Sequence, residues 1–244
     1  MKNFVVVIPA RLKSSRLPNK PLLKIKGIPM IIRTFQQCNK VVKKENIFVA
    51  TDSSKIINLC KKYNIKTVLT SKNCKTGTDR VFKVSKRIKA NNYINVQGDE
   101  PIFNPKDLTL MIKNLYKKSN KNKVLLGYCK FNNKKIMLNR NIPKVIFGKE
   151  NQLLYATRSP VPSKKEGVVK AGFRQVLVYS YPKTIFKKFK KIYNKKSFLE
   201  KIEDIEILRF LENKINVKLL KMSNKSKSVD TFKDLKYVEK LIKN

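Results

Sequence analysis

Four cationic side chains gather in one short stretch near the start of the chain, Pro9-Ala10-Arg11-Leu12-Lys13-Ser14-Ser15-Arg16-Leu17-Pro18-Asn19-Lys20-Pro21-Leu22. Two serine hydroxyls and several main-chain N–H groups lie among these cations, and three prolines restrict the loop. Such a set of donors suits a polyphosphate. The stretch lacks GxxxxGK[ST] and has no glycine, so it is neither a Walker loop nor a dinucleotide fingerprint. An ordinary basic surface loop is the alternative.

Two carboxylates stand where a metal ion could be held. Asp99 follows an expected strand in Asn95-Val96-Gln97-Gly98-Asp99-Glu100-Pro101, and Asp230 precedes the last expected helix in Ser228-Val229-Asp230-Thr231. Mg²⁺ is often held by one or two carboxylates, with phosphate oxygens and water filling the octahedron. The structural alternatives are a capped turn at Asp99 and a helix N-cap at Asp230.

The composition restricts the remaining chemistry. The chain has no histidine, which excludes imidazole acid–base catalysis, His-based triads and His metal sites. Its four cysteines are widely spaced and form no CxxC pair, which indicates reduced thiols and a cytoplasmic protein. We therefore expect a reaction that runs on carboxylates, amines, guanidinium groups and a bound metal ion.

The formal net charge of +41 has two interpretations. A strongly basic chain is typical of nucleic-acid binders. However, only nine of the 57 basic residues are arginine, and the lysines are spread over the expected helix faces. Nucleic-acid surfaces usually use arginine, so compositional drift is favoured. Six of the nine arginines lie in segments considered for other reasons: Arg11, Arg16, Arg80, Arg158, Arg174 and Arg209.

These residues need elements to position them, and the first 120 residues alternate apolar runs with amphipathic stretches. Strands are expected at 4–8, 46–51, 66–70 and 93–97, and helices at 29–42, 53–63, 78–89 and 105–118. This order predicts an α/β fold with a mostly parallel sheet wrapped by helices. No apolar run is long enough to span a membrane, and we interpret the first run as a strand rather than a signal peptide.

The alternation breaks near residue 120. Strands are expected at 124–130, 143–147, 152–157 and 173–181 without helices between them, which predicts a small antiparallel subdomain. Helices at 183–193 and 198–212, a strand at 216–221 and a helix at 231–242 capped by Asp230 complete the prediction.

Four segments taken together resemble a known family. They are the Pro9–Leu22 loop, Thr76-Gly77-Thr78-Asp79-Arg80, Asn95–Pro101, and Val229-Asp230-Thr231…Asp234-Leu235. In this order, and along the whole chain, they are similar to the 3-deoxy-manno-octulosonate (Kdo) cytidylyltransferases. The opening loop alone would fit many sugar nucleotidyltransferases, whereas PxKPL, TGTDR and VQGDEP jointly indicate the Kdo branch.

The resemblance implies a nucleotide-diphospho-sugar transferase-like fold and a reaction in which CTP and Kdo give CMP-Kdo and diphosphate. The activated sugar would serve lipopolysaccharide or another surface glycan. Arg11, Lys20 and Asp99 would carry catalysis, and Asp99 and Asp230 would hold Mg²⁺. The nucleotide-binding residues implied by the resemblance are Pro9, Ala10, Arg11, Ser15, Arg16, Lys20, Thr76, Gly77 and Arg80.

The sugar-binding residues implied by the resemblance are Gln97, Arg158, Gln175, Tyr179 and Glu206. Arg158 lies in Tyr155-Ala156-Thr157-Arg158-Ser159-Pro160-Val161-Pro162, which resembles the family's YFSRxxIP, and would bind the sugar carboxylate. The chain departs from the family pattern at Gln175, where histidine is usual, and at Ile207, where glutamine is usual. Loss of polar contacts can change selectivity by orders of magnitude, so a modified octulosonate or a nonulosonate is the alternative sugar.

The resemblance also implies a homodimer, built partly from an insertion around residues 120–170 within a single domain of residues 1–244. CTP and an acidic sugar are the expected ligands, and neither nucleic acid nor a membrane is an expected partner. A basic nucleic-acid-binding α/β module is the distant alternative, but no recognition-helix or aromatic RNP pattern supports it.

Overall fold

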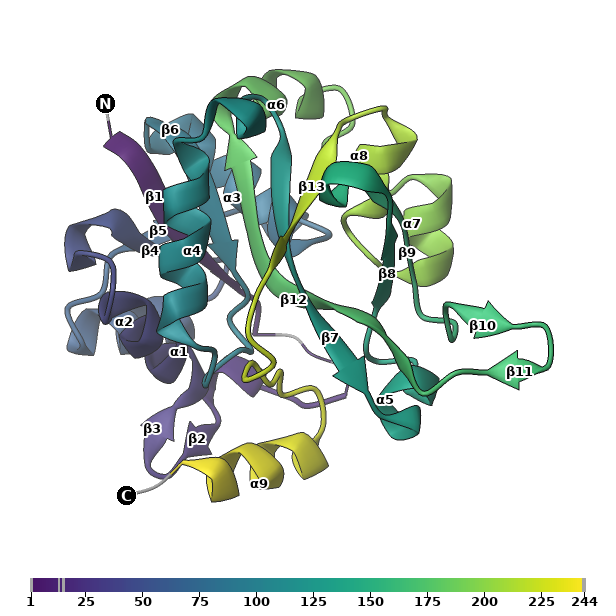
Figure 1. Cartoon of the computed structure of the whole chain (residues 1–244). Coiled ribbons are helices and arrows are strands. Elements are labelled where there is room, and N and C mark those ends of the chain that lie inside the picture. The colour runs from purple at the N-terminus through teal and green to yellow at the C-terminus, as the bar shows by residue number, and fades with distance from the viewer. Residues whose placement is uncertain (1, 13, 15, 243–244) are drawn as a thin grey trace. The chain divides into compact units, whose positions relative to one another are not determined.

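The computed structural model of the chain describes residues 2–12, 14 and 16–242 and divides into two compact units. The first unit joins Met1–Leu110 to Lys225–Asn244, and the second unit is Met111–Asn224. Figure 1 colours the chain by residue number, from purple at the N-terminus to yellow at the C-terminus. The first unit therefore combines segments that are far apart in the sequence.

The first unit is built on a parallel sheet in the order β6-β1-β4-β5. Its strands are β1 (Lys2–Ala10), β4 (Ile47–Thr51), β5 (Thr67–Leu69) and β6 (Ala90–Val96). In the centre, Val6 lies opposite Ile47 on one side and Ile94 on the other. The run Val5–Ile8 is fully buried, as expected for a central parallel strand covered on both faces.

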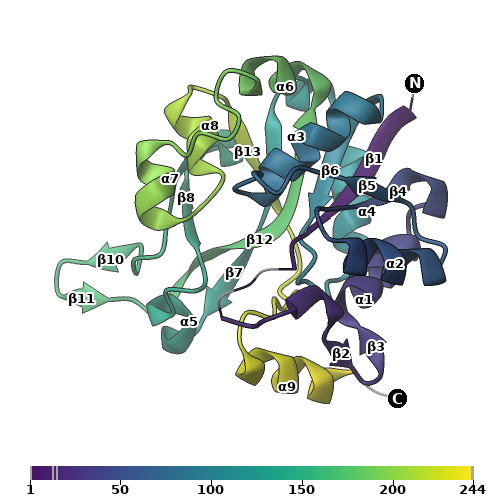
Figure 2. The same ribbon diagram turned by 180° about the vertical axis from the view of Figure 1, so that it is seen from behind.

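Helices α1 (Met30–Asn39), α2 (Ser54–Lys62) and α3 (Gly77–Arg87) pack against this sheet. Helix α1 contacts β1 and β4, α2 contacts β4 and β5, and α3 contacts β1, β4 and β6. Helix α4 (Pro105–Leu115) follows β6 in the sequence, and Figure 2 shows α3 from the other side. The short 3₁₀ helices of this unit are η1 (Lys20–Leu22) and η2 (Lys44–Asn46).

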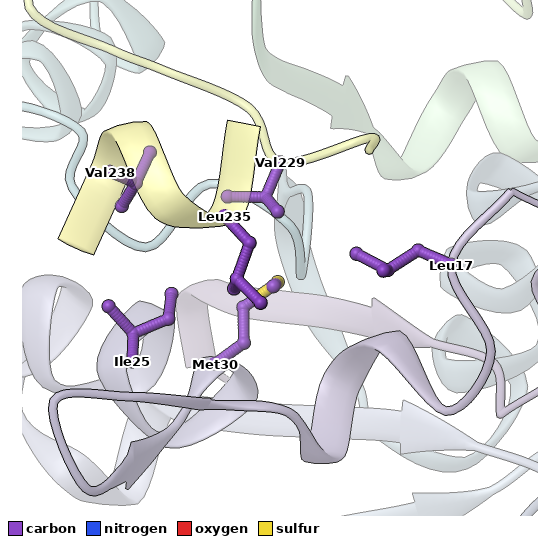
Figure 3. Packing of buried hydrophobic residues seen from close by; sticks show 6 residues of the cluster. All are labelled: Leu17, Ile25, Met30, Val229, Leu235 and Val238. Atoms are coloured by element: carbon purple, nitrogen blue, oxygen red, sulfur yellow. The ribbon is translucent and has the colours of Figure 1, made fainter. Parts of the chain in front are cut away.

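The last helix, α9 (Phe232–Leu241), belongs to the first unit and contacts β2 (Lys24–Ile25). β2 pairs with β3 (Ile28–Pro29) through a tight turn in which Lys26 and Gly27 both have positive φ. Figure 3 shows the apolar cluster between these segments, made of Leu17, Ile25, Met30, Val229, Leu235 and Val238. This cluster fixes the C-terminal segment against the loop that follows β1.

The second unit contains a mixed sheet in the order β13-β7-β12. β7 (Val124–Asn132) runs parallel to β13 (Val217–Lys221) and antiparallel to β12 (Ala171–Pro182). β8 (Lys144–Phe147) pairs antiparallel with both β12 and β9 (Leu153–Thr157). β10 (Ser163–Lys164) and β11 (Gly167–Val168) form a separate hairpin.

Helices α5 (Lys134–Leu138), α6 (Lys183–Phe189), α7 (Phe198–Glu203) and α8 (Leu208–Glu212) belong to this unit, with the 3₁₀ helices η3 (Lys118–Asn120) and η4 (Lys149–Asn151).

The α/β class and the mostly parallel, helix-wrapped sheet are confirmed, and three details are corrected. The helix expected at 198–212 is two helices, because Asp204 adopts a left-handed conformation with φ 50°. The N-cap of α9 is Thr231 rather than Asp230. The antiparallel region also contains a parallel pair, β7 and β13, and α5 and the two short ribbons β2–β3 and β10–β11 are not among the elements expected from the sequence. The second unit is longer than the 120–170 segment, and the single-domain assignment stays a prediction.

Candidate active site

Three of the predicted segments meet at the ends of neighbouring strands in the first unit. A Cβ built on Gly98 would lie 2.7 Å from the carbonyl oxygen of Pro9, so the turn after β6 approaches the end of β1 closely enough to need glycine. A Cβ on Gly77 would lie 3.1 Å from Nε2 of Gln97 and 3.2 Å from Cγ of Pro9. Ligands of open α/β sheets bind at such carboxyl ends of strands.

The loop that leaves β1 brings its cations to this edge. Ala10 is buried at the end of the strand and Arg11 is exposed directly after it. Ser15, predicted to bind the nucleotide, lies outside the described residues. Lys20 begins η1, after Asn19 in a left-handed conformation and before the buried Pro21. The backbone of η1 therefore fixes the direction in which the Lys20 side chain leaves the main chain.

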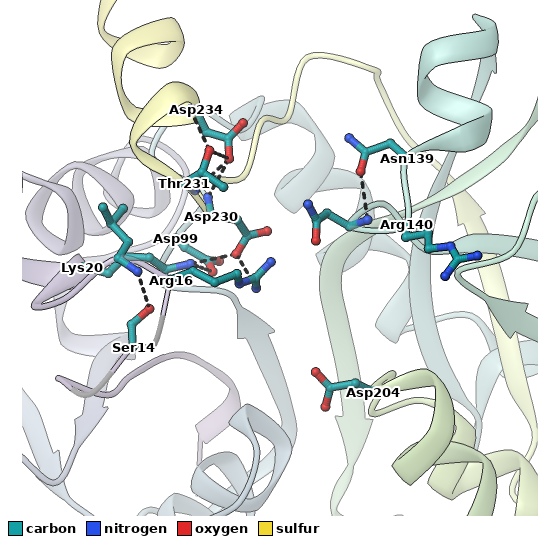
Figure 4. A network of polar contacts seen from close by, with 12 residues as sticks. Ser14, Arg16, Lys20, Asp99, Asn139, Arg140, Asp204, Asp230, Thr231 and Asp234 are labelled. Atoms are coloured by element: carbon teal, nitrogen blue, oxygen red, sulfur yellow. Dashed lines mark hydrogen bonds and ion pairs between the residues drawn. The ribbon is translucent and has the colours of Figure 1, made fainter.

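Lys20 is the centre of an ion-pair network that includes both predicted metal ligands (Figure 4). Its Nζ lies 2.6 Å from Oδ2 of Asp99 and 3.1 Å from Oδ1 of Asp230. Nη2 of Arg16 also lies 3.1 Å from Oδ1 of Asp230. Burial alone would lower the pKa of Lys20, but the neighbouring Asp99 and Asp230 carboxylates outweigh it and raise that pKa above its usual range.

The two carboxylates are held in place by contacts of their own segments. The main-chain N–H of Val229 donates to the carbonyl oxygen of Asp99 at 3.0 Å, which joins the loop after β6 to the segment before α9. The hydroxyl of Thr34 donates to the carbonyl of Gly98 at 3.1 Å and holds the same turn from α1. The apolar cluster in Figure 3 anchors α9 beside them.

Asp230 is not needed for helix capping. Thr231 and Asp234 form a reciprocal capping box at the start of α9, in which Thr231 Oγ1 accepts from the N–H of Asp234 and Asp234 Oδ2 accepts from the N–H of Thr231. The side chain of Asp230 instead pairs with Lys20 and Arg16. This removes the N-cap explanation for Asp230.

The donor set fits a hard divalent cation. One carboxylate oxygen of Asp99, Oδ1, is buried with no hydrogen-bond partner among the described residues, so its lone pairs are unused. The described residues contain no group of three or more His, Cys, Asp or Glu side chains that could hold a metal ion. Mg²⁺ commonly takes one or two protein carboxylates and completes its shell with phosphate and water, which suits Asp99 and Asp230.

Thr76 and Arg80 both have structural partners at the start of α3. Thr76 is the N-cap and forms a capping box with Asp79. The guanidinium of Arg80 donates to Asp52 Oδ2 at 2.9 Å and to Thr70 Oγ1 at 2.6 Å, and its side chain is 4% exposed. Arg80 can therefore act near a nucleotide through the shape of the α3 start, and direct contact with cytidine stays a prediction.

In the second unit, Arg158 ties three segments together. Its Nε, Nη1 and Nη2 donate to the carbonyl oxygens of Glu203, Arg140 and Asp204 at 2.5, 2.8 and 2.9 Å. Because the fork is engaged by the main chain, binding of a sugar carboxylate by Arg158 would require some of these bonds to be exchanged. Beside it, the buried Lys144 donates to the carbonyls of Asn139 and Arg158, and burial, with the Arg158 charge, lowers its pKa.

The other predicted sugar residues differ in their surroundings. Gln175 is buried on β12, where its Nε2 donates to the hydroxyl of Tyr179, and its Oε1 has no partner among the described residues. Glu206 is half-buried in the turn between α7 and α8. Ile207 is fully buried, so this departure from the family pattern places an apolar side chain in the core.

Three residues with notable polar contacts are not among those predicted from the sequence: Asp52, Lys144 and Glu203. Asp52 directly follows β4, so the rule that located Asp99 at a strand end could have found it. Glu203 accepts from the Thr157 hydroxyl at 2.6 Å and from the Arg158 N–H at 2.8 Å. No local pattern marks Glu203 or Lys144, because the partners of Glu203 lie 45 to 48 residues away in sequence and those of Lys144 are main-chain carbonyls 5 and 14 residues away.

The charged loops at the carboxyl edge of a parallel sheet have the character of a nucleotidyltransferase site. Comparison with known proteins identifies which family of nucleotidyltransferases the chain belongs to. The model of the cytidylyltransferase family matches residues 5–223. The chain therefore belongs to the cytidylyltransferase family and is a CTP-dependent nucleotidyltransferase.

The names of its relatives indicate one branch of this family. The 3-deoxy-manno-octulosonate cytidylyltransferase of Chloroherpeton thalassium is 34% identical over 98% of this chain and 97% of its own length. The protein of that name from Francisella tularensis is 35% identical over 99% of both chains. The solved structure of CMP:2-keto-3-deoxy-manno-octonic acid synthetase complexed with CTP matches with a TM-score of 0.88 and 29% identity, over 99% of this chain and 98% of that one. The resemblance seen in the sequence motifs is thus confirmed.

A more distant match supports the fold alone. The inositol-1-phosphate CTP transferase from T. maritima is 11% identical, with a TM-score of 0.67 over 98% of this chain and 94% of that one. In the part of the chain that the structure describes, no helix has the length and apolar character of a membrane span.

Proposed function

We propose that this cytidylyltransferase transfers CMP from CTP to Kdo and releases diphosphate, so that the activated sugar can enter lipopolysaccharide or another surface glycan. The observation that carries the proposal is the convergence of Lys20, Arg16, Asp99 and Asp230 at the strand ends of the first unit. The full-length similarity to proteins named for this sugar supports the substrate.

The residues divide the work of nucleotidyl transfer, which depends on positioning and charge neutralisation. Arg11, Arg16 and Lys20 bind the triphosphate and neutralise its charge. Asp99 and Asp230 hold Mg²⁺, which, when bound, lowers the pKa of the anomeric hydroxyl that attacks the α-phosphorus. Both carboxylates belong to rigidly packed segments, so they need little reorganisation before the reaction.

The nucleoside end of CTP belongs at the start of α3. Thr76 and Gly77 present small side chains and backbone there, beside Pro9 and Gln97. Arg80 holds this region in shape through Asp52 and Thr70. A site of small groups that hydrogen-bonds a pyrimidine edge would reject the larger purine ring.

The sugar end belongs to Gln97, Arg158, Gln175, Tyr179 and Glu206. The Oε1 of Gln175, which has no partner among the described residues, accepts a hydrogen bond from a sugar hydroxyl. The replacement at Gln175 is the specific observation that favours a second candidate, a modified octulosonate or a nonulosonate. A homodimer, a cytoplasmic location and a single-domain organisation complete the proposal. The four buried cysteines form no disulfide with one another, which is consistent with a reducing compartment.

Diphosphate release measured with CTP and a panel of sugar 2-keto acids tests the sugar assignment. We expect kcat/KM for Kdo to exceed that for a modified octulosonate or a nonulosonate at least tenfold. Gln175→His should leave this ranking unchanged, because both side chains offer one acceptor. A different preferred sugar would reject Kdo but keep the cytidylyltransferase; no diphosphate with any sugar would reject the proposed activity.

The same assay tests the nucleotide. With the preferred sugar, CTP should support a kcat/KM at least 100-fold above that for ATP or GTP, since buried groups left unpaired by the wrong base cost several kcal/mol. Similar turnover with a purine nucleotide would show that the start of α3 does not select the base.

A further inference from the structure

The ammonium group of Lys20 lies between the two carboxylates proposed as metal ligands. Nζ is within 3.1 Å of both Asp99 Oδ2 and Asp230 Oδ1, and the Lys20 side chain is only 15% exposed. A lysine in this position does for the two aspartates what a metal ion would do: it supplies a positive charge shared by both.

The aspartates do not depend on Lys20 for their proximity. The bond from the Val229 N–H to the Asp99 carbonyl and the apolar packing of α9 fix their segments together. Without the ammonium, two carboxylates would therefore face each other, an arrangement that strongly favours uptake of another cation.

The local charge is balanced as the structure stands. Two carboxylates, from Asp99 and Asp230, are matched by two cations, Lys20 and Arg16. A divalent ion approaching this set alone would gain little electrostatic free energy, because it would first have to displace the ammonium. A triphosphate changes the balance, since its negative oxygens offer Lys20 and Arg16 other partners.

We propose that Lys20 is a built-in counter-cation that keeps the metal site closed until the nucleotide arrives. Its ammonium neutralises Asp99 and Asp230 in the nucleotide-free protein and passes to the triphosphate when CTP binds, which frees both carboxylates for Mg²⁺. The inference rests on the proposed function in that it takes these aspartates as the metal ligands. Metal binding and nucleotide binding are then coupled, and by reciprocity each strengthens the other.

Direct titration with Mn²⁺ in the absence of nucleotide tests the inference, with free Mn²⁺ followed by electron paramagnetic resonance. Lys20→Met should bind Mn²⁺ at least tenfold more tightly than the wild-type protein. Lys24→Met removes the same charge from an exposed position four residues away and should bind as the wild type does. Adding Asp230→Asn to Lys20→Met should abolish the gain, which would place the ion on these carboxylates.

Thermal unfolding provides a second readout. Mn²⁺ should raise the Tm of Lys20→Met more than that of the wild type, and Lys20→Gln replaces Lys20→Met if the latter does not fold without metal. Equal Mn²⁺ affinity in wild type and both Lys20 variants would overturn the inference. Diphosphate release by the wild type separates the two proposals: turnover without the Mn²⁺ gain rejects only the counter-cation, and the gain without turnover rejects only the proposed reaction.

Discussion

At the scale of single residues, the start of α9 separates the side chains that cap the helix from the carboxylate that pairs with cations. The main-chain N–H of Asp230 donates to Asp234 Oδ2 at 3.1 Å, while its carboxylate turns to Lys20 and Arg16. Helix capping is thus the work of Thr231 and Asp234, and the Asp230 carboxylate is left for the ion pairs and for the proposed metal ion. On that proposal, adjacent residues carry the two functions.

This division predicts opposite effects for two substitutions. Asp230→Asn should lower kcat/KM at least 100-fold, because a metal ligand loses its charge, and should leave the free energy of unfolding nearly unchanged. Asp234→Ala breaks the capping box, so it should cost about 1 kcal/mol of stability with a much smaller effect on kcat. Denaturant unfolding and steady-state kinetics measure both.

Near-wild-type turnover of Asp230→Asn at saturating Mg²⁺ would remove Asp230 from the site. If the two aspartates act on one ion, combining Asp99→Asn with Asp230→Asn should be little worse than the worse single variant, since residues that act as a unit are non-additive.

The prediction for Arg11 depends on the geometry of its guanidinium group rather than on its charge. It is exposed directly after β1, where a guanidinium can bind phosphate oxygens through two parallel bonds. Arg11→Lys keeps the charge but loses the fork, so kcat/KM should fall at least tenfold. Arg87→Lys is the matched control. Arg87 is the last residue of α3, away from the start of that helix, and donates to the carbonyl of Leu69, so this variant should retain wild-type kinetics. Equal kinetics of the two variants would assign Arg11 no bidentate contact.

At the scale of elements, the break between α7 and α8 is stabilised by a buried ion pair. Arg209 donates to Glu200 through Nε and Nη2 at 2.6 Å each, and both side chains are 1% exposed. Glu200 also belongs to the capping box of Ser197 at the start of α7. The pair therefore joins the two short helices on either side of the turn that carries Glu206.

Removing one partner leaves an uncompensated charge in the core. Glu200→Ala should lower the free energy of unfolding by about 3–5 kcal/mol. Lys196→Ala breaks the exposed pair with Asp204, whose side chain is 72% exposed, and should cost less than about 1 kcal/mol. Urea unfolding of the two variants measures the difference; a loss below 1 kcal/mol for Glu200→Ala would show that the pair contributes only neutral packing.

The same elements show which features a sequence can predict. The strands of the parallel sheet are found because Val5–Ile8 and Ile47–Ala50 are continuous buried apolar runs bounded by polar turns. The break at Asp204 cannot be predicted in this way, because the apolar spacing of residues 198–212 continues through it. What ends α7 is a left-handed residue and a turn fixed by Arg158 and Arg209, both of which act through tertiary contacts.

In the candidate site, too, some features can be predicted from the sequence and others depend on tertiary contacts. Asp99 and the basic loop are predictable because strand ends in α/β sheets are local features with a known use. The choice between capping and metal binding at Asp230 depends on which of two adjacent side chains caps α9 and which faces Lys20. That choice is made by the packing of α9 on a segment about 200 residues away in sequence.

At the scale of the whole molecule, the net charge of +41 is the feature that the reaction does not use. The described ion pairs join only a minority of the lysines to carboxylates, since the chain has 57 basic and 16 acidic residues. Like charges at this density repel one another and destabilise the compact state. Compositional drift and nucleic-acid binding both tolerate this repulsion, but they make different demands on where the lysines lie.

Salt should therefore stabilise this protein. Raising NaCl from 50 to 500 mM shortens the Debye length from roughly 14 to 4 Å and screens the repulsion between lysines. We expect a gain of about 1 kcal/mol, or roughly 2–4 °C in Tm for a chain of this size. The local network opposes this trend only slightly, because partly buried pairs such as Lys20 with Asp99 are screened less. Lys20→Met should show the same dependence of Tm on salt as the wild type, which would assign the effect to the surface as a whole and not to the Pro9–Leu22 loop. A Tm that falls with NaCl would mean that ion pairs outweigh repulsion, and the lysines would then have to be arranged beside the few carboxylates rather than spread over the surface.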